Sequence, residues 1–484
     1  MLKIIKTEKN MLKFSDYPNA DRVFFYFEEI SKIPHGSYNT APIADYLENF
    51  AKTHSLDYKR DSADNVIIKK NATAGFETRP TVILQGHTDM VVEKTADCAK
   101  NLDTDGLDLY VDGDFIRAKG TTLGGDDGVA VAYMLAILES SSIPHPALEM
   151  LFTSDEEVGL LGADALDTSS LNGKIMINID SDDEGIFTVG CAGGARVDFS
   201  LPIKRCTSTH KYYKLSVSDL LGGHSGVEID KCRANAIKLG AKILSSFGEV
   251  RIVSVEGGTK DNAIPREFSA TFTTEFGIGG VFEEAKASVL KAYKGIEHHA
   301  KITLTECDSE TDALDYESSK AVISILNEVK TGVISMSEDI KGLVESSENL
   351  AIANICGESF EFTVSVRSSK ADKKDELIEH LKSIAEKYGA KVSVRGAYPA
   401  WEYKKESHIR DTACKVFYDM YGKEAKVITI HAGLECGIFS NKIEGLDCIS
   451  LGPDNYDIHT TEEHLSISST ARVFDFLKNV LKEI

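Results

Sequence analysis

The sequence LEMLFTSDEEVG, residues 148–159, joins a short apolar run to three consecutive carboxylates. Because the run from Leu148 to Phe152 has the length of a buried strand, the acids come where that strand should end. Adjacent side chains leave a strand end in opposite directions. Glu157 could therefore face a metal ion while Glu156 stands beside the water that the ion holds, as a ligand and a general base do in metal-assisted hydrolysis. A solvated acidic loop is the alternative for an isolated stretch of this kind.

Length and charge limit the classes of protein to which the chain can belong. At 484 residues it is too long for one ordinary core, so two domains are expected. The net charge of −22 repels nucleic acid and anionic membrane surfaces, which excludes both as expected partners. The sequence shows neither an export signal nor a run of about twenty apolar residues. Its nine cysteines form no Cys-x-x-Cys pair, which argues against a disulfide framework and favours a cytoplasmic location.

The first part of the chain alternates apolar runs with helical periodicity. A helix over residues 128–140 is expected to be buried on all sides, because its residues are mostly apolar. This alternation predicts an α/β core. The runs that we interpret as buried strands cover residues 66–68, 81–84, 148–152 and 175–179.

A different texture begins after Gly190. Residues 196–201 and 212–218 alternate apolar and polar side chains, which is typical of antiparallel strands with one wet face. The earlier character returns from about His408. We therefore predict that a second domain is inserted into the first.

Candidate metal ligands follow the predicted strands. His87 and Asp89 come after the apolar run 82–84, and the period of two lets both face one side. The glycine-rich stretch GTTLGGDDG, residues 120–128, precedes the long helix and places Asp126 and Asp127 at its N-terminus. Either aspartate could cap the helix, and either could bridge two cations.

Two further candidates lie later in the chain. Asp180 follows the strand expected at residues 175–179, and His459 lies in a polar loop with His464 as a competitor. Histidine nitrogens and carboxylate oxygens suit zinc or manganese. Since ligands bind at the carboxyl ends of strands in an α/β sheet, these side chains are expected to meet there.

Several motifs resemble those of the M20 metallopeptidases. They are GHTDMV at 86–91, GTTLGGDDG at 120–128, DEEVG at 155–159, NIDS at 178–181 and GGHSG at 222–226. The match is closest to the branch of bacterial cytosolic aminoacyl-histidine dipeptidases, because of CAGG at 191–194, NAIPR at 262–266 and HAGLECG at 431–437. The resemblance covers nearly the whole chain, although residues 1–10 have no clear counterpart.

The resemblance implies a fold and a domain order. It predicts an α/β, zinc-peptidase-like catalytic domain made of residues 1–190 and 396–484. An α+β lid of residues 191–395 is inserted into it. In relatives the lid sheet usually pairs subunits, so a homodimer through the lid is expected.

The resemblance also assigns a role to each candidate residue at the metal centre. It implies two divalent ions, Zn²⁺ first, with Mn²⁺ or Co²⁺ as alternatives. Asp89 would orient the imidazole of His87, and Glu156 would be the general base. The implied ligands are His87 and Asp180 for one ion, Glu157 and His459 for the other, and Asp126 as the bridge.

Substrate contacts are implied in the same way. His224, Asn262 and Arg367 would bind the scissile carbonyl oxygen or the substrate carboxylate, and Glu435 would hold the free α-amino group. The function implied is a dinuclear dipeptidase that hydrolyses unblocked dipeptides, of Xaa-His type and broader, by a metal-bound water. An N-acyl amino acid deacylase and a non-catalytic peptide-binding relative are the alternatives. The complete set of ligands together with Glu156 weighs against the binding protein.

Overall fold

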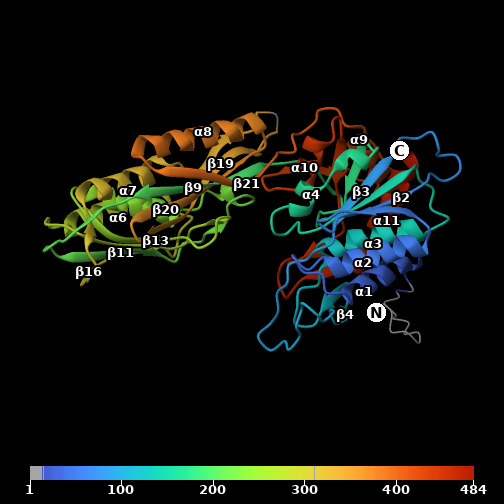
Figure 1. Cartoon of the computed structure of the whole chain (residues 1–484), viewed down its shortest axis with the longest axis horizontal. Coiled ribbons are helices and arrows are strands. Elements are labelled where there is room, and N and C mark those ends of the chain that lie inside the picture. The colour runs from blue at the N-terminus through green and yellow to red at the C-terminus, as the bar shows by residue number, and fades with distance from the viewer. Residues whose placement is uncertain (1–13, 15, 310, 339) are drawn as a thin grey trace. The chain divides into compact units, whose positions relative to one another are not determined.

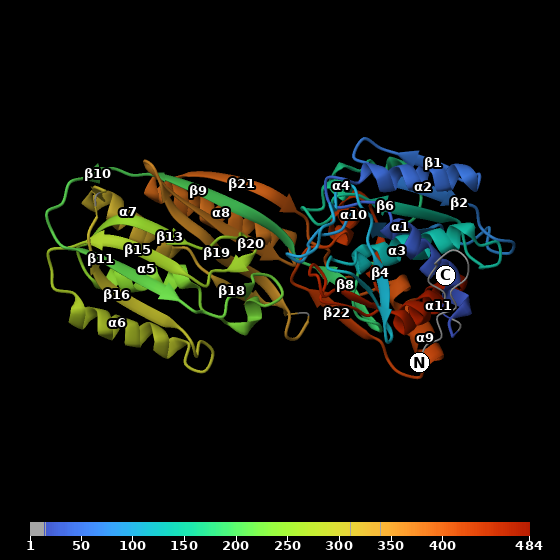
Figure 2. The same cartoon turned by 90° about the horizontal axis from the view of Figure 1, so that it is seen from below.

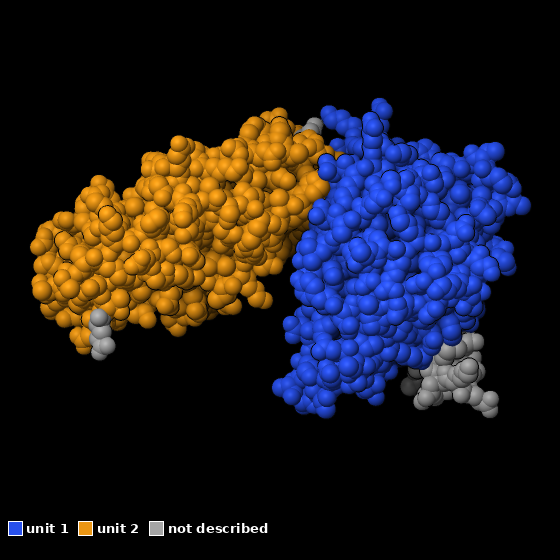
Figure 3. All heavy atoms as spheres, viewed as in Figure 1, with its two compact units in different colours: residues 1–190, 403–429, 434–484 blue, residues 191–402, 430–433 orange. Residues whose placement is uncertain are grey.

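The structure is a computed structural model that describes residues 14, 16–309, 311–338 and 340–484. Residues 1–10, for which no counterpart is expected, lie outside this part. The chain divides into two compact units (Figure 3): unit 1 contains Met1–Gly190, Tyr403–Thr429 and Leu434–Ile484, and unit 2 contains Cys191–Glu402 and Ile430–Gly433. Unit 2 is therefore inserted in sequence between parts of unit 1. The division into catalytic and lid domains after residues 190 and 395 stays a prediction.

An eight-stranded sheet forms the centre of unit 1. β6, β3, β7 and β23 are adjacent in this sheet and run parallel to one another, so their carboxyl ends lie at one edge. Each is largely buried, as the apolar runs at residues 81–84, 148–152 and 175–179 predicted for β3, β6 and β7. In spatial order the strands are β1 (Asp57–Arg60), β2 (Val66–Lys70), β6 (Leu148–Thr153), β3 (Val82–His87), β7 (Ile175–Asn178), β23 (Asp447–Ser450), β8 (Ile186–Cys191) and β22 (Lys426–Ile430).

Helices cover this sheet. Figure 1 shows α1, α2 and α3 lying together below β2 and β3, and α3 packs on α1 and β3. Residues 128–138 of α3 are all buried, which confirms the prediction of a helix that is buried on all sides. The helices of unit 1 are α1 (Asp21–Ser31), α2 (Ala41–Thr53), α3 (Gly125–Glu139), α4 (Leu161–Ala165), α9 (His408–Tyr421), α10 (Glu435–Lys442) and α11 (Ile467–Glu483), with the 3-10 turns Pro18–Ala20 and Thr168–Ser170.

A small four-stranded sheet lies beside the main one in unit 1. Its strand β25 leads directly into α11. Its order is β24 (Asn455–Tyr456), β25 (His464–Ser466), β5 (Phe115–Ala118) and β4 (Leu109–Asp112).

Unit 2 is built on a nine-stranded antiparallel sheet. Along β9, Ala195, Val197, Phe199 and Leu201 are buried while the residues between them are partly exposed, as the alternation predicted. β9, β20 and β21 lie side by side, with α8 next to them (Figures 1 and 2). The order is β16 (Lys301–Cys307), β11 (Tyr212–Ser218), β15 (Phe268–Thr273), β13 (Arg251–Gly257), β19 (Val344–Cys356), β20 (Ser359–Ser368), β9 (Gly193–Pro202) and β21 (Lys391–Tyr398), and β18 (Gly332–Met336) also pairs with β19.

The remaining elements of unit 2 are helices and short strand pairs. The helices are α5 (Ala236–Ser246), α6 (Gly279–Ala292), α7 (Tyr316–Glu328) and α8 (Ala371–Tyr388), with the 3-10 turn Ile229–Lys231. The short pairs are β12 (Gly223–His224) with β14 (Ala263–Ile264), and β10 (Arg205–Cys206) with β17 (Ala313–Leu314).

Both units therefore mix helices and strands, and the predicted α/β class is confirmed. Each unit has its own hydrophobic core. Among the described residues, none of the helices combines the length and apolar character that crossing a membrane requires.

Candidate functional site

The five predicted metal ligands meet in unit 1. His87 is the last residue of β3, Glu157 lies in the loop after β6, and Asp180 follows β7 by two residues. These three strands are parallel neighbours, which explains why their following residues share one edge of the sheet. Asp126 arrives from the start of α3, and His459 from the turn between β24 and β25.

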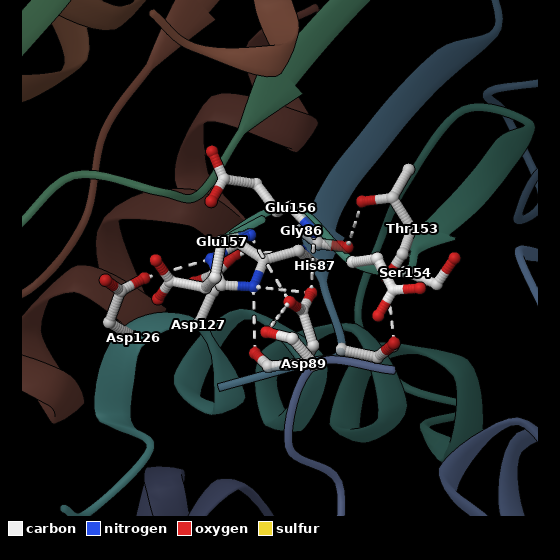
Figure 4. A network of polar contacts seen from close by, with 12 residues as sticks. Gly86, His87, Asp89, Asp126, Asp127, Thr153, Ser154, Glu156 and Glu157 are labelled. Atoms are coloured by element: carbon white, nitrogen blue, oxygen red, sulfur yellow. Dashed lines mark hydrogen bonds and ion pairs between the residues drawn. The ribbon is translucent and has the colours of Figure 1, made fainter. Parts of the chain in front are cut away.

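The carboxylate of Asp126 lies between two imidazoles. Its Oδ1 is 3.0 Å from Nε2 of His87, and its Oδ2 is 3.1 Å from Nε2 of His459. Asp180 Oδ1 lies 3.9 Å from Nε2 of His87, and Glu157 Oε1 lies 2.9 Å from Nε2 of His459. Figure 4 shows Asp126, His87 and Glu157 directed toward one another.

Two groups of possible ligands share Asp126. Ligand atoms of His87, Asp126 and Asp180 all lie within 4.8 Å of one another, and so do those of Asp126, Glu157 and His459. A third group with the same spacing contains His87, Glu156 and Glu157. The positions of the two glutamates therefore allow Glu156 to be either a ligand or a base.

His87 is held in place by the chain that follows it. Its Nδ1 lies 2.9 Å from the backbone oxygen of Asp89, while the carboxylate of Asp89 is 3.5 Å from the same nitrogen. That carboxylate accepts hydrogen bonds from the backbone N–H groups of Glu156 at 2.9 Å and Glu157 at 3.3 Å, and from the Ser37 hydroxyl at 2.8 Å.

Both the backbone oxygen and the carboxylate of Asp89 lie near Nδ1 of His87, and the backbone oxygen is the nearer of the two. That Asp89 orients this imidazole stays a prediction. The chain turns after β3 and brings the Asp89 carbonyl to the ring, while the Asp89 carboxylate accepts two N–H groups of the loop after β6. A proton on Nδ1 leaves Nε2 of His87 free to bind a metal.

Burial and the contacts between carboxylates and imidazoles shift the pKa values of the residues in this site. Burial opposes the ionisation of Asp126, but hydrogen bonds with His459 and His87 hold its pKa below the usual range. Burial also opposes the protonation of His459, yet Asp126 and Glu157 raise its pKa to about 10. Burial raises the pKa of Asp180 and of Glu156 well above the ordinary values, and neighbouring carboxylates add to the effect.

The donor set also fits metal ions. Oδ2 of Asp180 is buried with no hydrogen-bond partner among the described residues, and such an oxygen is costly unless it is paired or binds a metal. Imidazole nitrogens and carboxylate oxygens are the ligands that zinc and manganese accept.

The two competing residues, Asp127 and His464, make other contacts. Oδ2 of Asp127 accepts the backbone N–H of His87 at 3.2 Å, and its carboxylate packs against Gly86. The ring of His464 lies 4.8 Å from that of Phe115, and its Nδ1 is 2.8 Å from the backbone oxygen of Glu462. Neither Asp127 nor His464 belongs to any of the possible ligand groups found among the described residues.

Three of the predicted substrate-binding residues belong to unit 2. His224 lies on β12, and Asn262 directly precedes its partner strand β14. Arg367 lies on β20 and is 4% exposed, with Nη1 donating to the hydroxyl of Tyr398 at 2.7 Å. The charge of Arg367 contributes to lowering the pKa of His224, after burial, so the two side chains are near each other.

Glu435 is the fourth predicted substrate-binding residue and lies in unit 1, at the start of α10. Its Oε2 accepts hydrogen bonds from Gln85 and from the Thr153 hydroxyl, and its Oε1 is buried without a partner among the described residues. Burial raises its pKa to about 7.

Two polar contacts near these candidates were not predicted. In unit 2, Ser347 Oγ lies 2.7 Å from Nε2 of the buried His431. In unit 1, the buried carboxylate of Glu463 binds the loop that carries Asp126. Nothing in the sequence distinguishes Glu463, four residues after His459, from its neighbour Glu462.

Comparisons with known proteins agree with this geometry. The family described as Peptidase family M20/M25/M40 matches residues 83–483. The chain is 34% identical over 471 residues to the cytosol non-specific dipeptidase of Escherichia coli (strain K12), covering 95% of this chain and 96% of that protein. The crystal structure of aminoacylhistidine dipeptidase from Vibrio alginolyticus is similar with a TM-score of 0.88 and 32% identity, covering 96% of both chains. An aminopeptidase from Bacillus cereus shares the fold, with a TM-score of 0.58 and 18% identity over 96% of this chain and 98% of its own.

Proposed function

Because the chain belongs to the peptidase family M20/M25/M40, and is therefore a hydrolase of peptide bonds, we propose that it is a metal-dependent dipeptidase with two divalent ions. The observation that carries the proposal is the pair of ligand groups sharing Asp126. The names of the Escherichia coli and Vibrio alginolyticus proteins support unblocked dipeptides as substrates, including those of Xaa-His type. The first of these names also supports a cytoplasmic location.

Each ion has its own ligands in the proposal. His87 and Asp180 would hold one ion, Glu157 and His459 would hold the other, and Asp126, which belongs to both ligand groups, would be shared by the two. Zinc suits this set best, and Mn²⁺ or Co²⁺ would also fit. When bound, the ions activate a water and polarise the scissile carbonyl.

Glu156 is the proposed general base. It takes a proton from the attacking water and returns it to the nitrogen of the leaving amine. Asp89 supports this role, because its carboxylate accepts the backbone N–H groups of both Glu156 and Glu157 and so holds the backbone that carries the two side chains. Asp89 would thus position both the proposed general base, Glu156, and a proposed metal ligand, Glu157.

The ends of the substrate need charged partners. Glu435 would bind the free α-amino group through the oxygen that has no partner in unit 1. Arg367 would bind the substrate carboxylate, because its guanidinium can donate two parallel hydrogen bonds. The Tyr398 hydroxyl holds the guanidinium at 2.7 Å, and His224 and Asn262 would bind the carbonyl oxygen or that carboxylate. Unit 2 would then be the lid domain, and a homodimer would form through it.

A substrate panel tests the proposal. Zinc-reconstituted protein is incubated with an unblocked dipeptide such as alanyl-histidine, its N-acetylated form, a tripeptide and an N-acyl amino acid, and the products are identified by mass spectrometry. We expect the unblocked dipeptide to be cleaved fastest, and chelator-treated protein to cleave none of them. Preferred cleavage of the N-acyl amino acid would favour a deacylase. Binding without cleavage by metal-replete protein would favour a peptide-binding relative.

A further inference from the structure

The carboxylate of Glu463 accepts hydrogen bonds from four consecutive backbone N–H groups. Its Oε2 lies 2.7 Å from the nitrogen of Leu123 and 3.0 Å from that of Gly124. Its Oε1 lies 2.8 Å from the nitrogen of Gly125 and 3.3 Å from that of Asp126. Glu463 is 3% exposed, so these bonds are shielded from water. A charged acceptor makes each of them stronger than a bond between neutral groups.

An ordinary helix cap does not explain this contact. A cap residue precedes its own helix and satisfies one or two of the first N–H groups. Glu463 comes more than three hundred residues later, and the bonded N–H groups precede the helical part of α3, because Asp126 and Asp127 have non-helical backbone angles. Gly124 has a φ of 68°, which glycine adopts without strain and which lets the loop turn around the carboxylate.

Both segments that Glu463 joins are anchored elsewhere. Glu463 directly precedes β25, where Leu465 pairs with Ile116 of β5. The loop 123–126 leads into the buried helix α3. His459 lies in the turn just before Glu463, and its φ of 62° is unusual for a residue other than glycine. One carboxylate therefore ties the loop of Asp126 to the turn of His459.

We propose that Glu463 is a positioning residue that fixes the Asp126 carboxylate relative to the His459 imidazole, and so sets the affinity of the centre for metal ions. This inference rests on the proposed metal centre. Ligands must stand within about 0.2 Å of their ideal distances to bind a metal well. Asp126 and His459 are 333 residues apart in the chain, and Glu463 connects their backbones. Glu463 belongs to none of the possible ligand groups found among the described residues.

The test compares three variants with the wild type. Glu463→Gln removes the charge and places an amide NH2 group opposite the backbone N–H donors. Glu463→Asp keeps the charge but shortens the side chain by one methylene group. Glu462→Gln is the matched control, since it makes the same charge change one residue away on a side chain that is 77% exposed. The affinity for Zn²⁺ is measured by competition with a chromophoric chelator, and thermal unfolding of each zinc-free protein is recorded alongside.

We expect both Glu463 variants to lose roughly tenfold to a hundredfold in Zn²⁺ affinity, as changes around metal ligands typically do, and Glu462→Gln to bind as the wild type does. A wild-type protein that binds no Zn²⁺ would refute the metal centre itself. If the wild type binds and Glu463→Asp binds equally well, only the positioning role is refuted, whatever happens in Glu463→Gln. A lower melting temperature with unchanged affinity would show a purely structural contact and would also refute it. Should Glu463→Gln not fold, the affinity of Glu463→Asp alone decides.

Discussion

Replacing Glu156 and Glu157 by glutamine, one at a time, separates the proposed base from the proposed ligand. The two residues are neighbours, and each substitution removes one negative charge, so the change in charge is the same. The surroundings differ, because Glu157 lies 2.9 Å from His459 and shares a ligand group with it and Asp126. Glu156 shares a group only with His87 and Glu157.

The expected magnitudes follow from these positions. Glu156→Gln keeps every proposed ligand, so it should retain both ions and lose roughly a hundredfold to ten-thousandfold in kcat, the usual contribution of a general base. That loss raises the barrier by about 3–5 kcal/mol. Glu157→Gln replaces a carboxylate ligand by a neutral amide, which binds a metal ion more weakly, so this variant should retain about one ion.

The assay measures zinc per protein by elemental analysis and kcat with an unblocked dipeptide on the same samples. A metal-depleted Glu156→Gln protein beside a metal-replete Glu157→Gln protein would reverse the two roles. Equal zinc content and equal kcat in both variants would remove the proposed base altogether.

Two further changes test the proposed bridge and the burial of Glu348 in unit 2. Asp126→Ala should reduce the bound zinc from two ions to one or fewer and abolish turnover, because the oxygens of Asp126 face both imidazoles. Asp127→Asn should keep both ions, because Asp127 binds the backbone of His87 instead. Elemental analysis that finds the opposite pattern would move the bridge to Asp127. In unit 2, burial raises the pKa of Glu348 from 4.5 to about 7, so its contribution to the free energy of unfolding is complete below about pH 4.5 and is lost as the pH rises toward 7. Glu348→Gln should therefore stabilise the protein at pH 8 by up to about 3 kcal/mol and have little effect at pH 4.5, as denaturant unfolding at the two pH values would reveal. Equal effects at both pH values would contradict the buried, uncharged state.

The elements of the core could be predicted because their apolar patterns are strong. The helix at residues 128–140 and the strand at residues 148–152 match α3 and β6, and the family resemblance that their motifs indicated is confirmed. β19 (Val344–Cys356) was missed because it buries polar residues such as Ser346 and Asn349, which hide the alternation of a strand. α10 is eight residues long and buries Glu435, so its sequence carries no strong apolar pattern.

The candidate metal residues were recognisable for a related reason. Each of His87, Glu157 and Asp180 follows an apolar run, so the parallel sheet brings them to one edge. Hydrogen bonds between distant loops leave no such pattern in a sequence. The contact of Glu463 with residues 123–126 and the use of the Asp89 backbone oxygen by His87 therefore emerge only in three dimensions.

Anomalous diffraction at the zinc edge, from crystals of the zinc-reconstituted protein, tests the two-ion centre most directly. The account predicts two peaks, one bound by His87 and Asp180 and the other by Glu157 and His459, with one oxygen of Asp126 at each. A single peak, or peaks that do not contact Asp126, would contradict it.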